Sequence, residues 1–452
     1  MCPMENAEPL DLLLVDEEEG KPIKGGPASI DNLLYIAFRW GFAPPKLAVP
    51  LLAVQSRAAG HSVASIYCPT LPGKIKEFIP LLKRRPLVAG ITTVAMFDPK
   101  QLAYLIGLIR YFSPSTVVVL GGHGADNSAE MRSLGDIYVS FHGEGALADV
   151  VAAVKAGTPP EKIPGVERDS EGVLRLRGSL RYEGIRKVLY PDWSATSTSF
   201  FSRRYPIEAS RGCNFNCSYC GFPGKAGQVF RPAEDVIGEM LYSWKARGIR
   251  RFEFMDSALT SNTEFMAKFC AGLRKTGVRF NWNCFARPDA FVRNPELAAD
   301  MASSGCNRVL IGVESVHDRI LSAMRRGMNR ETVEKALDSL FKAKITVYGN
   351  FIIGFPGETE ATVKETADFI IKRPFAFTSL CSFWASEDMM RLAASRPEEY
   401  AHLAGLPGKG WRHDGMDYAG SRLLAKRAVR RINLHKFWIR AFAAEATGPE
   451  LP

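Results

Sequence analysis

The sequence lacks any apolar run long enough to cross a bilayer, and it lacks the pattern of a secretion signal. Residues 1–6 (MCPMEN) contain no basic stretch that leads into an apolar one. A transmembrane helix needs about 20 apolar residues in succession. We therefore expect a cytoplasmic protein with no membrane partner. Without a secretion signal, the nine cysteines are not expected to form a disulfide framework.

Charge of one sign is not gathered into a tail. The net charge of +10 is spread along the chain, so it favours anionic partners only in general. Near the C-terminus, Leu424, Ala428 and Ile432 recur at helical spacing among arginines and lysines. Such a helix suits either contact with RNA or the solvated face of a helix that covers a barrel. No recognised RNA-binding module accompanies it, so no nucleic-acid partner is expected.

The first third of the chain alternates short apolar runs with amphipathic stretches, which is typical of βα units and a parallel sheet. It predicts a doubly wound, Rossmann-like α/β domain over residues 1–156, with its ligand beyond the C-terminal ends of the strands. The expected strands are 11–15, 63–67, 87–92, 117–120 and 137–140. Residues 157–200 are rich in Gly, Pro and Ser and predict a linker with a small hairpin.

Three cysteines, Cys213, Cys217 and Cys220, lie within eight residues. Thiolates are the usual protein ligands of iron–sulfur clusters, and this spacing lets three sulfurs face one cluster. No fourth cysteine and no histidine lies nearby, so one iron would keep an open position. A structural zinc site would need a fourth ligand. The other cysteines that could supply it are Cys270, Cys284, Cys306 and Cys381. Three unrelated core cysteines are a further alternative.

The βα alternation continues after the cysteines. A strand at 205–209 precedes them, which places the cysteine loop at the C-terminal face of a barrel, where such folds carry their sites. Six βα units over residues 201–385 predict a partial (β/α)6, TIM-type barrel, followed by a helical region over 386–452. Ser261 and Glu264 have the spacing of a capping box at the start of one barrel helix.

These motifs together resemble the core of the radical S-adenosylmethionine (SAM) enzymes. The segments that carry the likeness are 211–220, Asp256, 282–284 with Arg287, 311–315 and 351–359. The resemblance implies a 4Fe–4S cluster on the three cysteines and SAM bound beside it. It further implies SAM contacts from Tyr219, Gly221, Asp256, Glu314, Ser315 and Gly354. Asp256 and Glu314 also suit structural caps at strand ends, and 354–359 also suits a turn.

The first domain resembles the cobalamin-binding domain of cobalamin-dependent radical SAM enzymes. The likeness includes glycine-containing turns after the fourth and fifth strands. The implied cobalamin contacts are Thr92, Gly121, Gly122, His123, Gly143 and Glu144. No Asp-x-His occurs in the chain, so the resemblance implies cobalamin held without a histidine ligand. Tight turns, or a scaffold that no longer binds the corrin, are the alternatives.

A corrin domain followed by a radical barrel implies methyl transfer from SAM, through methylcobalamin, to an unactivated carbon. The substrate would be a small molecule, a natural-product intermediate or a peptide, and an electron donor such as flavodoxin or ferredoxin would reduce the cluster. Some relatives with these two domains catalyse cyclisation, oxidation or rearrangement instead. A cobalamin-binding sensor or carrier is a third hypothesis, which the intact cysteine motif disfavours.

Overall fold

The computed structural model divides the chain into two compact units, residues 1–203 and 204–452. The residues it describes are 9–16, 47–67, 69, 74–93, 98–122, 125, 128–140, 142–178, 189–191, 193, 204–220, 227–435 and 440–444. Among these, no helix is long and apolar enough to span a membrane.

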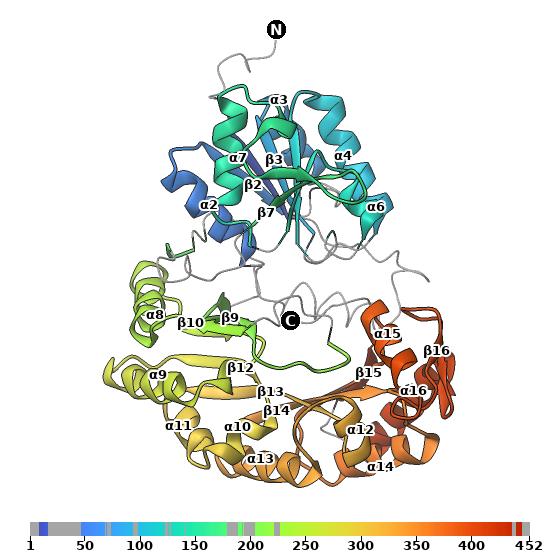
Figure 1. The fold of residues 1–452 in the computed structure, drawn as a ribbon. Coiled ribbons are helices and arrows are strands. Elements are labelled where there is room, and N and C mark those ends of the chain that lie inside the picture. Colours follow the sequence, from blue (N-terminus) through green and yellow to red (C-terminus); the bar gives the residue numbers. More distant parts are fainter. Residues whose placement is uncertain are drawn as a thin grey trace. The chain divides into compact units, whose positions relative to one another are not determined.

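The first unit is built on a sheet with strand order β2-β1-β3-β4-β5-β7-β6 (Figure 1). The first five of these strands are parallel, and their 2-1-3-4-5 order is a doubly wound arrangement. The strands are β1 (Leu12–Asp16), β2 (Val63–Tyr67), β3 (Val88–Thr92), β4 (Val117–Gly121) and β5 (Ile137–Ser140). All five predicted strands are confirmed to within one residue.

Helices cover both faces of this sheet because neighbouring residues of each strand point to opposite sides. On β1, Leu13 and Val15 pack with α3 (Ile75–Lys83) and α4 (Pro99–Phe112). The alternate residues, Leu12 and Leu14, pack with α2 (Ala48–Ala58) and α7 (Ala146–Lys155). A short helix, α6 (Ala129–Arg132), completes the unit. Strands buried on both faces read as continuous apolar runs, which is why the sequence located them well.

The predicted hairpin is present, but it belongs to the first unit's sheet. Strands β6 (Val166–Arg168) and β7 (Leu174–Arg177) pair antiparallel, and β7 adds to β5 in parallel. The sheet therefore extends to residue 177 and does not end at 156, where the sequence placed the start of a linker. The remaining stretch of that linker, 178–203, lies largely outside the described residues.

The second unit carries a sheet whose strands follow the chain: β8-β11-β12-β13-β14-β15, all parallel, with β19 added beside β15. The strands are β8 (Tyr205–Ile207), β11 (Arg251–Phe254), β12 (Asn281–Ala286), β13 (Cys306–Glu314), β14 (Thr346–Ile353), β15 (Phe377–Ser382) and β19 (Arg440–Ala444). Six successive parallel strands agree with the predicted six βα units. A separate antiparallel pair, β9 (Ser210–Cys213) and β10 (Gly227–Phe230), carries the cysteine loop.

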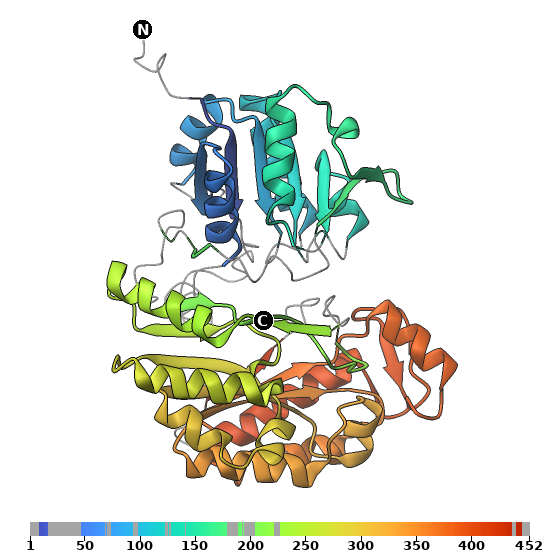
Figure 2. The same cartoon turned by 60° about the vertical axis from the view of Figure 1, so that its left-hand side comes forward.

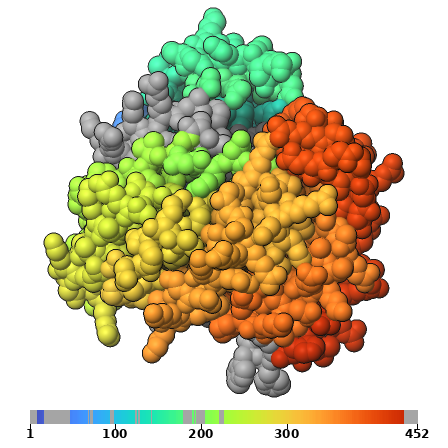
Figure 3. Space-filling model, turned by 60° about the horizontal axis from the view of Figure 1, so that its bottom comes forward, coloured from blue at the N-terminus to red at the C-terminus, as the bar shows by residue number. Residues whose placement is uncertain are grey.

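Helices cover one face of this second sheet (Figures 1 and 2). They are α8 (Ala233–Arg247), α9 (Thr263–Lys275), α10 (Pro288–Arg293), α11 (Leu297–Ser303), α12 (Asp318–Ala323), α13 (Arg330–Lys342) and α14 (Glu360–Ile371). Aromatic rings fill part of the layer between helices and strands: Phe254, Phe269 and Trp282 lie with their centroids 5.3 to 5.6 Å apart. Seen from the helical side, the yellow and orange segments form a continuous surface (Figure 3).

The start of α9 differs from its prediction. Asn262, and not Ser261, is the N-cap, because its side chain accepts a hydrogen bond from the backbone N–H of Phe265 at 2.9 Å. The Ser261 hydroxyl instead donates to the side chain of Gln228 on β10. The expected capping box with Glu264 is therefore wrong by one residue.

The C-terminal region is helical, as predicted, but it also contains strands that the sequence did not reveal. The helices are α15 (Glu387–Ser395) and α16 (Tyr418–His435), and a small sheet of β16 (Ala404–Gly405), β17 (Trp411–His413) and β18 (Met416–Asp417) lies between them. Strands of two or three residues are too short to show an alternation of apolar and polar residues. The basic helix α16 packs on α14, where Arg431 binds Asp368 at 2.5 Å. This contact favours the covering-helix interpretation over RNA binding.

One carboxyl group is buried in the turn that links β14 to α14. Glu358 is only 1% exposed, and it accepts a hydrogen bond from the backbone N–H of Gly354. Burial raises its pKa from 4.5 to about 8, against the opposing effect of that hydrogen bond. The pKa of Glu358 is therefore higher in the folded chain than in the unfolded chain. Between pH 4.5 and about pH 8 the folded chain binds more protons, so the free energy of unfolding falls as the pH rises through this range.

We predict that Glu358→Gln flattens this pH dependence. The amide keeps an acceptor for Gly354 but cannot ionise, so the decrease in unfolding free energy between about pH 4.5 and pH 8 should shrink. Urea unfolding at several pH values measures it. The matched control is Glu360→Gln, whose side chain is 75% exposed and which should keep the parent slope. Parent-like pH dependence in Glu358→Gln would contradict the buried-carboxyl interpretation.

Candidate functional site: a cysteine-lined pocket

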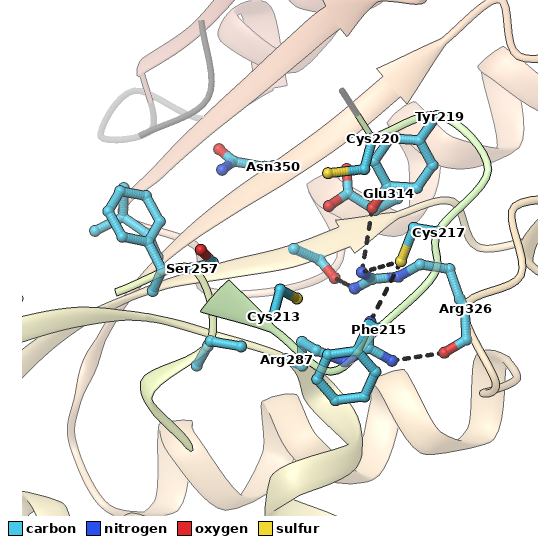
Figure 4. Close-up of a pocket in the computed structure, with 15 residues that line it drawn as sticks. Cys213, Phe215, Cys217, Tyr219, Cys220, Ser257, Arg287, Glu314, Arg326 and Asn350 are labelled. Atoms are coloured by element: carbon cyan, nitrogen blue, oxygen red, sulfur yellow. Dashed lines mark hydrogen bonds between the residues drawn. The ribbon is translucent and has the colours of Figure 1, made fainter. Parts of the chain in front are cut away.

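The three cysteines line one pocket on the face of the second sheet that the helices leave open (Figure 4). Cys213 ends β9, and Cys217 and Cys220 lie in the loop that follows. The pocket's other lining residues are Phe215, Tyr219, Ser257, Ala258, Phe285, Ala286, Arg287, Leu310, Gly312, Glu314, Arg326 and Asn350. The loop thus brings its thiols to the C-terminal ends of the strands, as predicted.

Hydrogen bonds at its base and in its middle hold the loop in place. At its base, the carboxylate of Asp256 accepts from the Ala209 N–H at 3.1 Å and from the Ser210 hydroxyl at 2.5 Å. In its middle, Ser218 is tied to the end of α12: its N–H donates to the Met324 carbonyl at 3.1 Å. A loop fixed in this way presents its cysteines without rearrangement, which a ligand site requires.

A buried arginine, Arg326, links the cysteine loop to the sheet. Its Nη1 lies 3.7 Å from the Cys217 sulfur and 3.1 Å from the Tyr219 hydroxyl. Its Nη2 donates to the Gly312 carbonyl at 2.5 Å. Arg326 is buried, with only 5% of the residue exposed. Desolvation alone would lower its pKa, but Tyr219, Glu314 and Cys217 outweigh burial and raise it, so the cation is firmly held.

A second arginine, Arg287, contacts the same sulfur. Its Nη1 lies 3.6 Å from Cys217, its Nη2 donates to the Arg326 carbonyl at 2.6 Å, and its guanidinium stacks 3.5 Å from the Phe215 ring centroid. Its Nε is bound to Asp289 at 2.9 Å. N–H groups directed at a cysteine sulfur stabilise the thiolate, which is the form that binds iron.

Glu314 faces this pair of cations from the end of β13. A register shift between Gly312 and Glu314 marks a bulge, and Glu314 has the left-handed backbone angle φ = 64°. Bulges of this kind re-aim side chains beside functional sites. Burial raises the pKa of Glu314, while Arg326, Tyr219 and Arg287 oppose the rise. Burial likewise raises the pKa of Tyr219 well above its usual value, against Arg326.

Two of the predicted SAM contacts line the pocket and three do not. Tyr219 and Glu314 line it, whereas Asp256, Ser315 and Gly354 are absent from its walls. Asp256 binds the base of the loop, as the alternative of a structural cap anticipated. Ser315 accepts from the His317 N–H at 3.2 Å and so closes a turn. Gly354 is a packing position, since a Cβ there would lie 2.5 Å from Cβ of Ser421. Gly221 lies outside the described residues.

The pocket's composition fits an iron–sulfur cluster better than a zinc ion. None of Cys270, Cys284, Cys306 and Cys381 lines it, so among the described cysteines no fourth thiol joins the three. Within the described residues, no three Cys, His, Asp or Glu side chains close around a single point as a lone metal ion requires. A cluster accepts each thiolate on a different iron, so thiols spread over a pocket wall suit it. Two cations beside the thiolates also suit an anionic cluster.

The predicted cobalamin contacts lie at the strand ends of the first unit. Thr92 and Gly121 end β3 and β4, and Gly143 and Glu144 follow β5, whereas His123 lies outside the described residues. Among the described residues, a Cβ on Gly121 or Gly143 would meet nothing closer than 3.5 Å, so packing against those residues does not explain these glycines. Room at the backbone is what close approach of a bulky ligand needs. This fits a corrin tail.

The sequence singled out Thr92, but the neighbouring Thr93 organises this edge. Its hydroxyl lies 3.0 Å from the carbonyls of both Gly121 and Gly122, and it accepts from the Ala125 N–H at 3.0 Å. Thr93 is fully buried. A threonine at the end of a predicted strand was the only available signal, and it did not distinguish Thr92 from Thr93.

We predict that Asp256→Ala lowers the unfolding free energy of the chain by about 1–3 kcal/mol, because the buried Ala209 N–H loses its acceptor. Denaturant unfolding followed by fluorescence measures the loss. Asp338→Ala, an exposed aspartate on α13, is the matched control and should change stability by less than about 0.5 kcal/mol. Equal effects of the two variants would contradict the structural role assigned to Asp256.

Comparisons with known proteins agree with this site. The Radical SAM superfamily model matches residues 207–370, which include the cysteine loop, Glu314 and Arg326. Domains of this superfamily use a 4Fe–4S cluster and SAM, so both expected cofactors are confirmed at the level of the family.

Two relatives are named as methyltransferases. The bacteriochlorophyllide d C-12(1)-methyltransferase of Chlorobaculum tepidum is 34% identical over 41% of this chain and 42% of its own length. An uncharacterised methyltransferase of Pyrococcus horikoshii is 28% identical over 68% of this chain and 71% of its own. The match to the first relative thus spans less than half of that protein.

Solved structures show the same fold over both units. The radical SAM methyltransferase TsrM of Kitasatospora setae, with tryptophan substrate and a SAM analogue bound, has a TM-score of 0.68 and 19% identity, covering 85% of this chain and 76% of its own. The cobalamin-dependent SAM radical enzyme OxsB has a TM-score of 0.61 and 19% identity, covering 80% of this chain and 52% of its own. Residues 207–370 therefore resemble the Radical SAM superfamily, and the chain shares its fold with TsrM and OxsB.

Proposed function

We propose that this protein is a cobalamin-dependent radical SAM methyltransferase that methylates an unactivated carbon. The observation that carries the proposal is the pocket of three thiols that also holds Tyr219, Glu314 and Arg326, with no fourth thiol from any other described cysteine. The names of both relatives described above support methyl transfer. The substrate would be a small molecule, a natural-product intermediate or a peptide.

In such an enzyme the residues that line the pocket would have different roles. Cys213, Cys217 and Cys220 would hold the cluster, and Glu314 and Arg326 would offer opposite charges to the amino and carboxylate groups of SAM. When bound, the cluster and SAM supply the radical that removes a substrate hydrogen, and the cobalamin supplies the methyl group that replaces it. Phe215, Phe285 and Leu310 would exclude water from that chemistry.

The first unit would hold cobalamin without a histidine ligand, at the strand ends where Gly121 and Gly143 leave the backbone open. TsrM has been solved with cobalamin and a 4Fe–4S cluster bound, and OxsB with aqua-cobalamin. We further propose that the two sheets belong to the Rossmann-like and partial TIM-barrel classes and that the protein acts in the cytoplasm. A flavodoxin or ferredoxin would be its electron donor.

A second candidate function is radical cyclisation. The anaerobic magnesium-protoporphyrin IX monomethyl ester cyclase of Synechocystis is 23% identical over 55% of this chain. SAM carrying a deuterated methyl group separates the two functions. A methyltransferase delivers the label to its product, whereas a cyclase yields an unlabelled product.

We predict that Cys217→Ala abolishes cluster assembly while cobalamin binding survives, because the two sites lie in different units. Iron, sulfide and corrin are quantified after anaerobic purification with cobalamin present. Cys381→Ala, which removes a thiol outside the pocket, is the matched control and should retain iron. Failure of the parent protein to take up corrin would remove the methyl carrier and contradict the proposal.

A further inference from the structure

Two polar side chains of the pocket have no partner in the part of the protein that the structure describes. Asn350 and Ser257 line the pocket, yet among the described residues neither side chain makes a hydrogen bond. No dashed line reaches either of them in Figure 4. Arg287, Arg326 and Tyr219, by contrast, are hydrogen-bonded to the loop or to one another. Polar groups in a partly buried wall are usually paired, so these two are available to a ligand.

Asn350 lies on an inner strand of the second sheet, next to a glycine that makes room for two charged groups. It is the register partner of Gly312 on β13, and both residues line the pocket. A Cβ on Gly312 would lie 2.5 Å from Oε1 of Glu314 and 3.3 Å from Nη2 of Arg326. The missing side chain thus lets a carboxylate and a guanidinium lie over Gly312, one strand away from Asn350.

Apolar side chains form the wall beside this position. Leu310 on β13 pairs with Phe285 on β12, and both residues line the pocket. Ala258 and Ala286 line it as well. A ligand that reaches Asn350 therefore meets an aromatic ring and methyl groups, which favour an apolar body.

The neighbours of Asn350 disfavour a charged group at its amide. The carboxylate of Glu314 would repel an anion there, and the guanidinium of Arg326 would repel a cation. Arg326 is also bound to the Tyr219 hydroxyl and the Gly312 carbonyl, so an anion that recruited it would disturb contacts that hold the loop. These neighbours favour an uncharged polar group.

The Asn350 amide offers an N–H donor and a carbonyl acceptor side by side. Its complement is a group with an acceptor and a donor in the matching arrangement, so that two hydrogen bonds form, as they do between asparagine and the edge of a base. A trans peptide bond directs its N–H and its C=O to opposite sides. A ring amide or a primary carboxamide presents both on one edge.

We propose that Asn350 determines substrate specificity by forming two hydrogen bonds with an uncharged amide of the substrate. Its amide donates to the substrate carbonyl and accepts from the substrate N–H, while the apolar body of the substrate lies against Phe285 and Leu310. The inference rests on the proposed function, because it names the substrate class of that reaction. SAM would use Glu314 and Arg326, and Asn350 is left to orient the substrate.

The test compares amides with derivatives in which methyl groups replace the N–H hydrogens. Titration calorimetry is performed on the full chain, reconstituted anaerobically and saturated with SAM, without a reductant. One pair of probes is 2-quinolinone and 1-methyl-2-quinolinone, and the other is 2-naphthamide and N,N-dimethyl-2-naphthamide. In at least one pair the parent should bind the unmethylated probe about tenfold more tightly, the scale of hydrogen bonding lost in a partly buried site. The pair that shows the preference distinguishes a ring amide from a primary carboxamide.

Asn350→Leu should remove the preference, because leucine has a similar size but forms no hydrogen bond with its side chain. The affinity for SAM, measured by the same titration without a probe, should be unchanged. Asn307→Leu is the matched control, since it makes the same change at an exposed position of β13 outside the pocket and should keep the preference. A preference that persists in Asn350→Leu is steric, because the methylated probe meets a side chain of similar shape.

Three results would overturn the proposal: no preference of the parent in either pair, a preference that persists in Asn350→Leu, or a loss of SAM affinity in Asn350→Leu, which would assign Asn350 to SAM. The titration of the parent needs no variant, so it decides even if Asn350→Leu does not fold. None of these titrations requires turnover. Absence of methyl transfer with an intact amide preference would overturn only the proposed function, and the reverse result only the role of Asn350.

Discussion

The contact between the Arg326 guanidinium and Cys217 joins the parts of the site that are distant in sequence. Arg326 follows α12, yet it reaches the sulfur of Cys217, the hydroxyl of Tyr219 and the carbonyl of Gly312 on β13. A buried cation is tolerated only when it is well paired, and here its partners are the cysteine loop and the strand that ends in Glu314. This side chain therefore ties the thiols to the sheet. Arg287, which follows β12, reinforces the link by contacting the Cys217 sulfur and donating to the Arg326 carbonyl.

The sequence predicted the strands of the first sheet closely, for a physical reason. Parallel strands covered on both faces are continuous apolar runs, and β2 and β5 begin and end where the predicted strands do. The prediction failed where a strand is too short to show a pattern, or where two neighbouring residues suit the same role. The strands β16 to β18 have two or three residues each, and Asn262 and Ser261 are both ordinary helix caps. The hairpin of β6 and β7 was foreseen, but its addition to the sheet edge depends on pairing between segments that no local pattern records.

The candidate site could be predicted in part. The three cysteines were evident from the sequence, because their spacing is what lets three thiolates bind one iron–sulfur cluster. A strand-end position did not distinguish Glu314, which faces the pocket, from Asp256 and Ser315, which tie neighbouring segments together. Arg326 was missed as a site residue, since a single arginine in a basic chain carries no signal. The bulge beside Glu314 is a property of paired strands and has no sequence signature that the chain displays.

The central claim is that three thiolates hold an iron cube with one corner free for SAM. Electron paramagnetic resonance of the anaerobically reconstituted, reduced protein tests it directly, with and without SAM. We expect the spectrum of a single reduced 4Fe–4S cluster whose g values shift when SAM is added, because a new ligand has reached the open iron. A protein that contains zinc or no metal, or a cluster whose spectrum SAM leaves unchanged, would contradict the claim.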